Sequence, residues 1–432
     1  MVASLVISII TCMTMIGFII LKPTFTIKNL RLGTYWIVSL IGVIVLLIFS
    51  LVPFRDVIDG IFANTAINPI KILIIFITIT VISVYLDEVG FFRFLASKAI
   101  RKAGNSQIRL FVTLYLLVSI LTVFTSNDII ILTFTPFIFM FCKNAKINPI
   151  PYLISEFVAA NTWSMFLIIG NPTNIYLATS LNIDFADYIK IMWLPTVLAG
   201  LTSFAVLFLL FYKKLKIKIE NPDIEEVVIE DKFKLYLGVA FLVICIIGLA
   251  LANYIDLEMW MISLPCSLIL FTIAIIYALI KKEKPVEVVS TLKRAPWELI
   301  PFVISMFIIV QALDYNGVTS KLYNMLNVNH DALVYGLSSA LFANLLNNIP
   351  MSVLYSSVLA LGVNNEAAVF ASIIGSNIGA FLTPIGALAG IMWSSLLNKN
   401  NIKFSFVKFM KYGIRIGIPT LLAAILGVYI LL

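Results

Sequence analysis

Four short polar clusters interrupt an otherwise apolar chain, and their residue types are those that bind ions and small polar solutes. Two of them are the tetrapeptides Thr125-Ser126-Asn127-Asp128 and Asn347-Asn348-Ile349-Pro350. Their side chains offer oxygen atoms to a cation and N–H or O–H groups to an anion or a neutral acid. A helix that starts at the first cluster also directs its free N–H groups and positive dipole end at the ligand. Helix capping is the structural alternative for the same residue types.

The other two clusters place Gly and Pro inside long apolar runs. They are Gly170-Asn171-Pro172-Thr173-Asn174 and Thr383-Pro384-Ile385-Gly386, preceded by Asn161-Thr162 and Ser376-Asn377 respectively. Gly and Pro unwind a helix and free backbone carbonyl and N–H groups for a ligand. A Pro kink without function is common in membrane helices. Two matched kinks together with the two polar tetrapeptides favour a binding site.

Two carboxylates, Asp128 and Glu156, are the only ones placed well within the membrane, and no Lys or Arg accompanies them. An anion must therefore be held by helix termini and by Asn, Ser and Thr donors, with a bound cation as an addition. Asp128 is the first candidate for proton or cation coupling. Glu156 is the second, with snorkelling or pairing to an amide as its structural alternative. No structural metal or organic cofactor is expected, and a sodium ion near Asn127 and Asn348 is the one alternative.

The composition places these clusters in a bilayer. Of the 432 residues, 61% are hydrophobic and only 12% are charged, too few to cover soluble domains of this size. Soluble enzymes and nucleic-acid-binding proteins are therefore excluded, and the net charge of +8 is expected on cytoplasmic loops. The four cysteines are predicted to be buried thiols, and the single histidine, His330, a loop residue. The cysteines are Cys12, Cys142, Cys245 and Cys266.

Apolar runs of about 20 residues, enough to cross about 30 Å of hydrocarbon, predict about ten transmembrane helices. They lie at 2–21, 35–53, 70–86, 151–182, 191–212, 235–253, 259–280, 297–313, 366–397 and 412–432. Two pairs of shorter runs, 110–125 with 129–142 and 332–346 with 349–362, are predicted to be re-entrant hairpins. Legs of roughly 16 and 14 residues in the first pair reach only ~24 and ~21 Å. Their polar tips require an enclosing protein or a watery cavity.

The distribution of basic residues predicts the orientation. With both termini external, only four of the 30 Lys and Arg residues fall outside the cytoplasm. They are Arg55, Lys71, Lys190 and Lys321. The first hairpin, 110–142, then opens to the cytoplasm and the second, 332–362, to the exterior, so the two halves are inverted. The predicted divisions are a first repeat at 1–218 with a broken helix at 151–182, an acidic cytoplasmic linker at 219–234, and a second repeat at 235–432 with a broken helix at 366–397.

A faint internal repeat agrees with this division. Four residues of the first half match four of the second at a constant offset of 227: Pro69, Leu86, Asp87 and Gly90 with Pro296, Leu313, Asp314 and Gly317. After the tips the offset becomes 216, which pairs Asn161 with Asn377 and Gly170 with Gly386. Chance coincidence among common residue types is the alternative, but the matched blocks stay in register.

At these residues the chain resembles the ion-transporter superfamily of arsenite permeases, NhaD-type sodium/proton antiporters, citrate–metal transporters and divalent anion–sodium symporters. Ser126-Asn127-Asp128 is similar to the hairpin signatures of the divalent-anion and arsenite-permease branches. The second tip and the run 373–389 look closest to the arsenite-permease branch. The resemblance implies a transport domain that carries both hairpins and slides past a scaffold domain, often in a homodimer. It also implies a cytoplasmic ATPase partner if the chain is arsenite-permease-like.

The predicted fold is an all-α integral membrane protein with two inverted-topology repeats, two re-entrant hairpins, broken helices at the midplane and an elevator-type mechanism. The predicted function is secondary-active, proton-coupled transport across the plasma membrane, and not catalysis by an enzyme. The substrate is a small oxyanion or its neutral acid, arsenite or antimonite first and citrate or a dicarboxylate second. The alternative is a sodium/proton antiporter.

A channel or a membrane enzyme is a remote alternative. The polar residues cluster at four breaks instead of lining a pore, and no nucleophile–base pair or metal set is visible. The predicted substrate and ion site comprises Ser126, Asn127, Asp128, Asn161, Thr162, Gly170, Asn171, Thr173, Asn174, Asn347, Asn348, Ser376, Asn377, Thr383 and Gly386.

Overall fold

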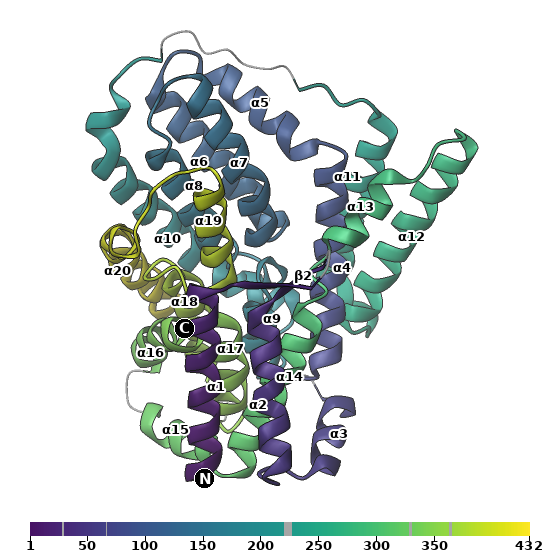
Figure 1. The fold of residues 1–432 in the computed structure, drawn as a ribbon, viewed down its shortest axis with the longest axis vertical. Helices are drawn as coiled ribbons and strands as arrows, with labels where there is room; N and C mark the ends of the chain where they lie inside the picture. Colours follow the sequence, from purple (N-terminus) through teal and green to yellow (C-terminus); the bar gives the residue numbers. More distant parts are fainter. Residues whose placement is uncertain (28–29, 66, 220–226, 328–330, 363–364) are drawn as a thin grey trace.

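The computed structural model describes residues 1–27, 30–65, 67–219, 227–327, 331–362 and 365–432, and within them the chain is nearly all helical (Figure 1). His330 and part of the acidic linker lie outside the described residues. The first half contains α1 (Val2–Leu21), α2 (Thr34–Ile48), α3 (Phe54–Phe62), α4 (Pro69–Glu88), α5 (Phe91–Ala103), α6 (Gln107–Phe124), α7 (Asn127–Asn144), α8 (Ile150–Trp163), α9 (Pro172–Thr179) and α10 (Phe185–Leu215). The second half contains α11 (Lys232–Leu251), α12 (Met259–Ile280), α13 (Val286–Arg294), α14 (Leu299–Tyr315), α15 (Val318–Leu326), α16 (Asp331–Leu346), α17 (Asn348–Leu359), α18 (Glu366–Gly379), α19 (Leu388–Lys399) and α20 (Phe406–Leu431).

Eight helical segments in the described part of the chain are long and apolar enough to cross a membrane. They are Val2–Leu21, Pro69–Glu88, Gln107–Phe124, Phe185–Leu215, Lys232–Ile255, Met259–Ile280, Val286–Tyr315 and Phe406–Leu431. Seven of them coincide with predicted spans, and all four cysteines are buried as predicted. The chain is therefore a multi-pass membrane protein.

One predicted span ends earlier than expected, and two others are interrupted as predicted. The run 35–53 ends early, at Ile48, because Ser50 adopts a positive φ of 50° and Pro53 precedes the separate helix α3. The runs 151–182 and 366–397 are interrupted, as their Gly and Pro residues predict. The first is divided into α8, a 3-10 turn at Ile168–Gly170 and α9, and the second into α18 and α19.

The legs of the first predicted hairpin are longer than expected. Helices α6 and α7 have 18 residues each, or about 27 Å at 1.5 Å per residue, so their length no longer argues against a full crossing. Helix α6 starts early because the Ser106 hydroxyl accepts the Arg109 N–H at 3.3 Å. Only Thr125 and Ser126 separate the two legs. The second pair, α16 and α17, keeps short legs of 16 and 12 residues.

Five elements have no counterpart in the prediction. Four are the short helices α3, α5, α13 and α15, which are too short and too polar to register as spans. The fifth is an antiparallel hairpin of β1 (Thr24–Ile27) and β2 (Leu30–Gly33) between α1 and α2. Helices α5 and α15 each begin after a left-handed glycine, Gly90 at φ +88° and Gly317 at φ +71°. These two glycines are paired by the 227-residue offset.

Many helix contacts recur when the two halves are exchanged. Helix α2 packs on α14 and α12 on α4, while α6 packs on α8 and α16 on α18. The pieces after the breaks follow the same rule, because α9 packs on α17 and α19 on α7. Figure 1 shows α9, α17 and α18 near the middle of the molecule. Each broken helix therefore completes its packing against the hairpin of the other half.

Contacts that involve the ends of helices and the loops beside them form two groups. One contains Lys71 with Glu258, Asp184 with Asn253, and the Leu333 N–H with Tyr429. The other contains Asp87 with Arg294, Asp231 with Lys281, and Glu298 with the Gly33 N–H. Every pair joins segments that the sequence assigns to the same side of the membrane. These contacts are those expected of two opposite rims.

Candidate functional site

A hydrogen-bonded junction around Asn377 joins the two halves of the chain. In α18, the Asn377 Oδ1 accepts hydrogen bonds from Ser164 Oγ at 3.0 Å and Asn171 Nδ2 at 3.1 Å. The Asn377 Nδ2 donates to Asn174 Oδ1 at 2.7 Å and to its own helix at the Ile373 carbonyl at 2.9 Å. All four amide and hydroxyl side chains are buried. The first break is therefore fastened to the helix that precedes the second break.

The junction continues to the first tip. The Asn161 carbonyl oxygen also lies 3.0 Å from Ser164 Oγ and shares its single hydroxyl proton with Asn377 Oδ1, and the Asn161 Oδ1 accepts from Asn127 Nδ2 at 3.1 Å. Asn127 in turn accepts the Asp128 N–H on its Oδ1 at 2.9 Å, and it is the first residue of α7. A polar path thus runs from the first tip, through the first break, to α18.

The second tip is bound directly to the second break. The Asn348 N–H donates to the Gly386 carbonyl at 3.0 Å, and Asn347 Nδ2 donates to the Ile385 carbonyl at 3.0 Å. Asn347 has a φ of +81° and a ψ of 152°, a conformation outside the left-handed helical region that residues with a Cβ rarely adopt. Thr383 Oγ1 donates to Asn344 Oδ1 at 2.6 Å, and Asn344 Nδ2 donates to the Gly379 carbonyl near the end of α18 at 2.8 Å.

Five of the predicted site residues carry a buried oxygen atom without a hydrogen-bond partner among the described residues. They are Ser126 Oγ, Thr162 Oγ1, Thr173 Oγ1, Asn348 Oδ1 and Ser376 Oγ. Buried polar groups in folded proteins are nearly always hydrogen-bonded, so each such atom calls for water, an ion or a ligand. All five belong to the tips, the breaks or the turn just before them. Fourteen other buried side-chain atoms among the described residues also lack a partner, so these five are notable for their place at the tips and breaks and not for being unpartnered.

Close backbone approach explains the glycine at the first break. A Cβ added to Gly170 would lie 2.1 Å from the Ser164 carbonyl oxygen, so only glycine fits beside the residue that bonds Asn377. A Cβ on Gly386 would lie 2.8 Å from Asn344 Oδ1. Both glycines are buried. They let the interrupted chain fold back onto its own side chains.

The two membrane carboxylates occupy different surroundings. Asp128 is half-buried in the first turn of α7, and its carboxylate has no hydrogen-bond partner or ion pair among the described residues. Glu156 in α8 is only 1% exposed and accepts hydrogen bonds from Thr135 Oγ1 on both oxygens, at 2.8 and 3.0 Å. No hydrogen bond in the described structure joins Glu156 to the tip or break residues. Asp128 therefore lies beside the polar path and Glu156 apart from it.

The sequence model described as "Citrate transporter" (CitMHS) matches residues 16–375, well over half of the chain. The chain belongs to this family.

Curated relatives and one solved structure agree with the family. The chain is 28% identical over 366 residues to the arsenical pump membrane protein of Escherichia coli K12, a match that covers 80% of this chain and 83% of that protein. It is 26% identical over 382 residues to the putative arsenical pump membrane protein of Bacillus subtilis, covering 81% and 85%. The crystal structure of the YdaH transporter of Alcanivorax borkumensis has a similar fold, with a TM-score of 0.57, 13% identity and 99% and 98% coverage. The family and these relatives are membrane transporters, so the predictions of a transporter and of the superfamily are confirmed.

In this citrate transporter family member, two residues that connect the tips and breaks to α18 were absent from the predicted site. Ser164 links Asn161 to Asn377, and Asn344 links Thr383 to α18. Asn344 had a usable signal, since it is an amide in an apolar run one helical turn before the second tip. Ser164 had a weaker one, because it lies between two clusters and a small hydroxyl residue is common in membrane helices.

Proposed function

We propose that this protein is a secondary-active transporter of a small oxyanion or its neutral acid. Arsenite or antimonite is the substrate we rank first, and citrate or a dicarboxylate is the substrate we rank second. The observation that carries the proposal is the buried junction of amide and hydroxyl side chains around Asn377, next to which in the sequence Ser376 and Thr173 keep unpartnered hydroxyl oxygens. Neutral amides and hydroxyls suit neutral arsenous acid, which presents three O–H groups. A bare anion would lack a guanidinium or ammonium partner at this site.

The names of the similar proteins decide which substrate we rank first. Proteins named as arsenical pumps match four-fifths of the chain, which favours arsenite and antimonite. The description of the family favours citrate. The proposal also includes a homodimer and, from the arsenical-pump relationship, a cytoplasmic ATPase partner. Cross-linking in native membranes and co-purification test these two associations.

We infer alternating access by an elevator-like movement of two inverted repeats. The exchange of packing between α9 with α17 and α19 with α7 supports the repeats, as does the recurrence of left-handed Gly90 and Gly317. The first tip bonds to Asn161 and the second tip to the second break, and Ser164 and Asn344 continue these links to α18, which favours movement of tips and breaks as one body. Within this proposal Asp128 couples transport to protons, since its carboxylate adjoins the path without a fixed partner.

A panel of thermal-unfolding measurements on purified protein tests the substrate class. Sodium, lithium, arsenite, antimonite, citrate and succinate are added separately at two pH values, because a ligand that binds the folded state raises the unfolding temperature. We expect arsenite or antimonite to stabilise the protein without sodium. Stabilisation by sodium alone, or by citrate only after sodium is added, assigns the chain to the sodium-coupled alternative and overturns the substrate order.

Coupling is tested with Asp128→Asn in proteoliposomes. The variant keeps the size of the side chain and an acceptor oxygen but removes its titration, so flux driven by a pH gradient is expected to fall to background. Downhill exchange of substrate and the unfolding temperature are expected to stay near those of the unaltered protein. Undiminished pH-driven flux in this variant removes the coupling role of Asp128.

A further inference from the structure

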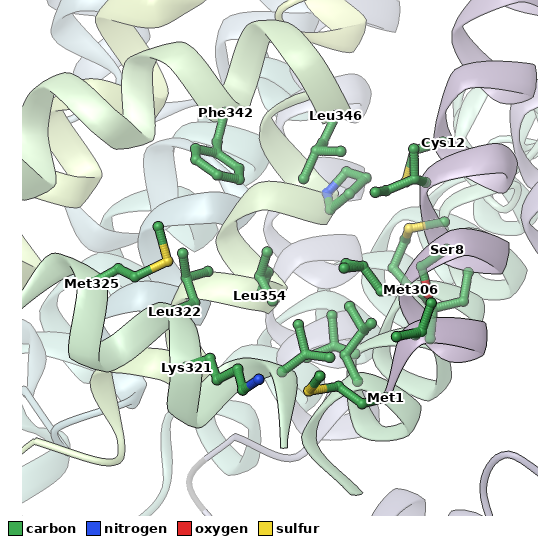
Figure 2. Close-up of a pocket in the computed structure, with 18 residues that line it drawn as sticks. Met1, Ser8, Cys12, Met306, Lys321, Leu322, Met325, Phe342, Leu346 and Leu354 are labelled. Atoms are coloured by element: carbon green, nitrogen blue, oxygen red, sulfur yellow. The ribbon is translucent and has the colours of Figure 1, made fainter. Parts of the chain in front are cut away.

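A large apolar cavity lies behind the second tip, apart from the polar path. Its volume is about 520 Å³, and its walls come from α1 and α14 on one side and from α15, α16 and α17 on the other. Figure 2 shows Phe342, Leu346 and Cys12 along one edge of the cavity, with Lys321 and Met1 along the opposite edge. The residues assigned to the substrate site do not line it.

The lining is chemically simple. Among its 18 residues, only Ser8 and Lys321 carry a strongly polar side chain, and the others are aliphatic, aromatic or sulfur-containing. Ser8 is 4% exposed and its hydroxyl has no partner among the described residues. A water molecule needs two to four polar partners, which this wall does not offer. The cavity therefore selects an apolar occupant.

Two cationic groups lie along one edge of the cavity, the Lys321 side chain and the N-terminal ammonium of Met1, which donates to Asn316 Oδ1 at 3.0 Å. Lys321 is exposed and belongs to α15. Within the described residues its ammonium group forms no ion pair. The rest of the cavity accepts hydrocarbon, so its occupant has an apolar body and an anionic end beside Lys321.

We propose that this cavity binds one acyl chain of an anionic phospholipid, with the phosphate group at Lys321. The chain lies between α1 and the α15–α17 segment and packs against their apolar side chains, while the phosphate group supplies the preference for an anionic lipid. The cavity is continuous with the surface of a protein that lives in a bilayer, so such a lipid is always available.

The position of the cavity gives this lipid a consequence for the second tip. Leu346 and Pro350 line the cavity and flank Asn347 and Asn348, which bond to the second break. An acyl chain in the cavity thus supports the tip from the side opposite the substrate path. The lipid site stands independently of the substrate that the transporter carries.

Photo-cross-linking of purified protein tests the proposal. The probes are phosphatidylglycerol and phosphatidylcholine, each with a diazirine in one acyl chain, and labelled peptides are located by mass spectrometry. We expect the phosphatidylglycerol probe to label cavity residues of α1, α14 and α16, including Cys12 or Phe342. Replacement Lys321→Gln should lower this labelling about five-fold, the effect of about one basic residue at a membrane surface. The matched surface variant Lys190→Gln, whose lysine pairs with Asp187 away from the cavity, should leave it unchanged.

A second pair of variants tests the cavity itself. Leu5→Trp fills it from α1, whereas Ile10→Trp adds the same bulk at a 58% exposed position of that helix outside the lining. We expect Leu5→Trp to abolish labelling of the cavity by both probes and Ile10→Trp to preserve it. Equal labelling by both probes that is insensitive to Lys321→Gln overturns the anionic-lipid assignment. Absence of any label in the cavity overturns the site. The measurement needs no transported substrate, so it is independent of the proposed function.

Discussion

Asn377 is the residue through which the two halves share one polar site. Its side chain makes four hydrogen bonds, and three of them reach Ser164, Asn171 and Asn174, more than 200 positions away in the chain. An amide suits this role because it donates and accepts at once. Neither an acid nor an aliphatic residue of the same size would satisfy all of these partners.

Replacement Asn377→Ala should destabilise the protein strongly. A buried hydrogen bond contributes about 1 kcal/mol, and an abandoned buried partner costs about 1–3 kcal/mol, so we expect a loss of about 3 kcal/mol in the free energy of unfolding. Denaturant unfolding in detergent measures it. Asn324→Ala on α15, where the side chain is exposed, is the control and should change the value by less than about 0.5 kcal/mol. Equal effects of the two variants would show that the junction contributes nothing to stability.

Glu156 is predicted to be structural. Glu156→Gln keeps an acceptor for Thr135 Oγ1, so pH-driven flux in proteoliposomes should stay within about two-fold of the unaltered protein. Thr135→Val removes the donor and leaves the carboxyl group unsatisfied, which should cost about 1–3 kcal/mol of stability. Loss of pH-driven flux in Glu156→Gln, with flux retained in Asp128→Asn, would transfer the coupling role to Glu156.

At the scale of elements, the left-handed turns before α5 and α15 set the direction in which each hairpin segment leaves the preceding long helix. Gly90 and Gly317 have positive φ, and a Cβ at either position meets no atom within 4 Å. The requirement is therefore conformational and not steric. The turn follows α4 in the first half and the corresponding helix, α14, in the second half.

Gly90→Ala and Gly317→Ala should each lower stability by about 1–2 kcal/mol, the cost of a left-handed conformation for a residue with a Cβ. Gly17→Ala in α1 is a matched control, because its Cβ also has open space while its backbone is helical. That control should raise stability by about 0.5–1 kcal/mol. Thermal unfolding of the three variants measures the contrast, and a stabilising effect at all three positions would contradict the assignment.

The sequence indicated the interrupted helices and most residues of the polar path, because Gly, Pro and amides are conspicuous in an apolar background. It did not indicate that α9 packs on α17 or that Asn377 bonds to the first break, since periodicity describes one helix and not its partner. The short helices α3, α5, α13 and α15 were missed because a span-length window averages them with their neighbours. The length of α6 was underestimated because its start depends on a capping hydroxyl at Ser106.

At the scale of the whole molecule, the predicted topology places the two groups of contacts between helix ends and loops on two opposite rims of the membrane protein. Lys71 with Glu258 lies on one rim and Lys281 with Asp231 on the other. The distribution of Lys and Arg predicts that the second rim is cytoplasmic. The Asp87–Arg294 pair on that same rim is nearly inaccessible at Asp87, whose side chain is 3% exposed.

Cysteine labelling tests this orientation. In a background without the four native cysteines, Tyr254→Cys should react with an impermeant maleimide in intact cells, and Ile217→Cys only after permeabilisation. Both native side chains are well exposed, at 76% and 66%, so the two sites differ in side and not in accessibility. The reverse pattern would invert the topology and exchange the openings of the two hairpins.

The junction around Asn377 also has a consequence for biosynthesis. Ser164, Asn171 and Asn174 enter the membrane long before α18 is made, since 203–213 residues separate them from Asn377. Protein synthesis adds about 5–20 residues per second. Their buried polar groups therefore lack a partner for roughly 10–40 s. During that interval the first half has unpaired polar groups within the membrane and is a target for membrane proteases. Truncated chains that end before α18 should therefore be short-lived.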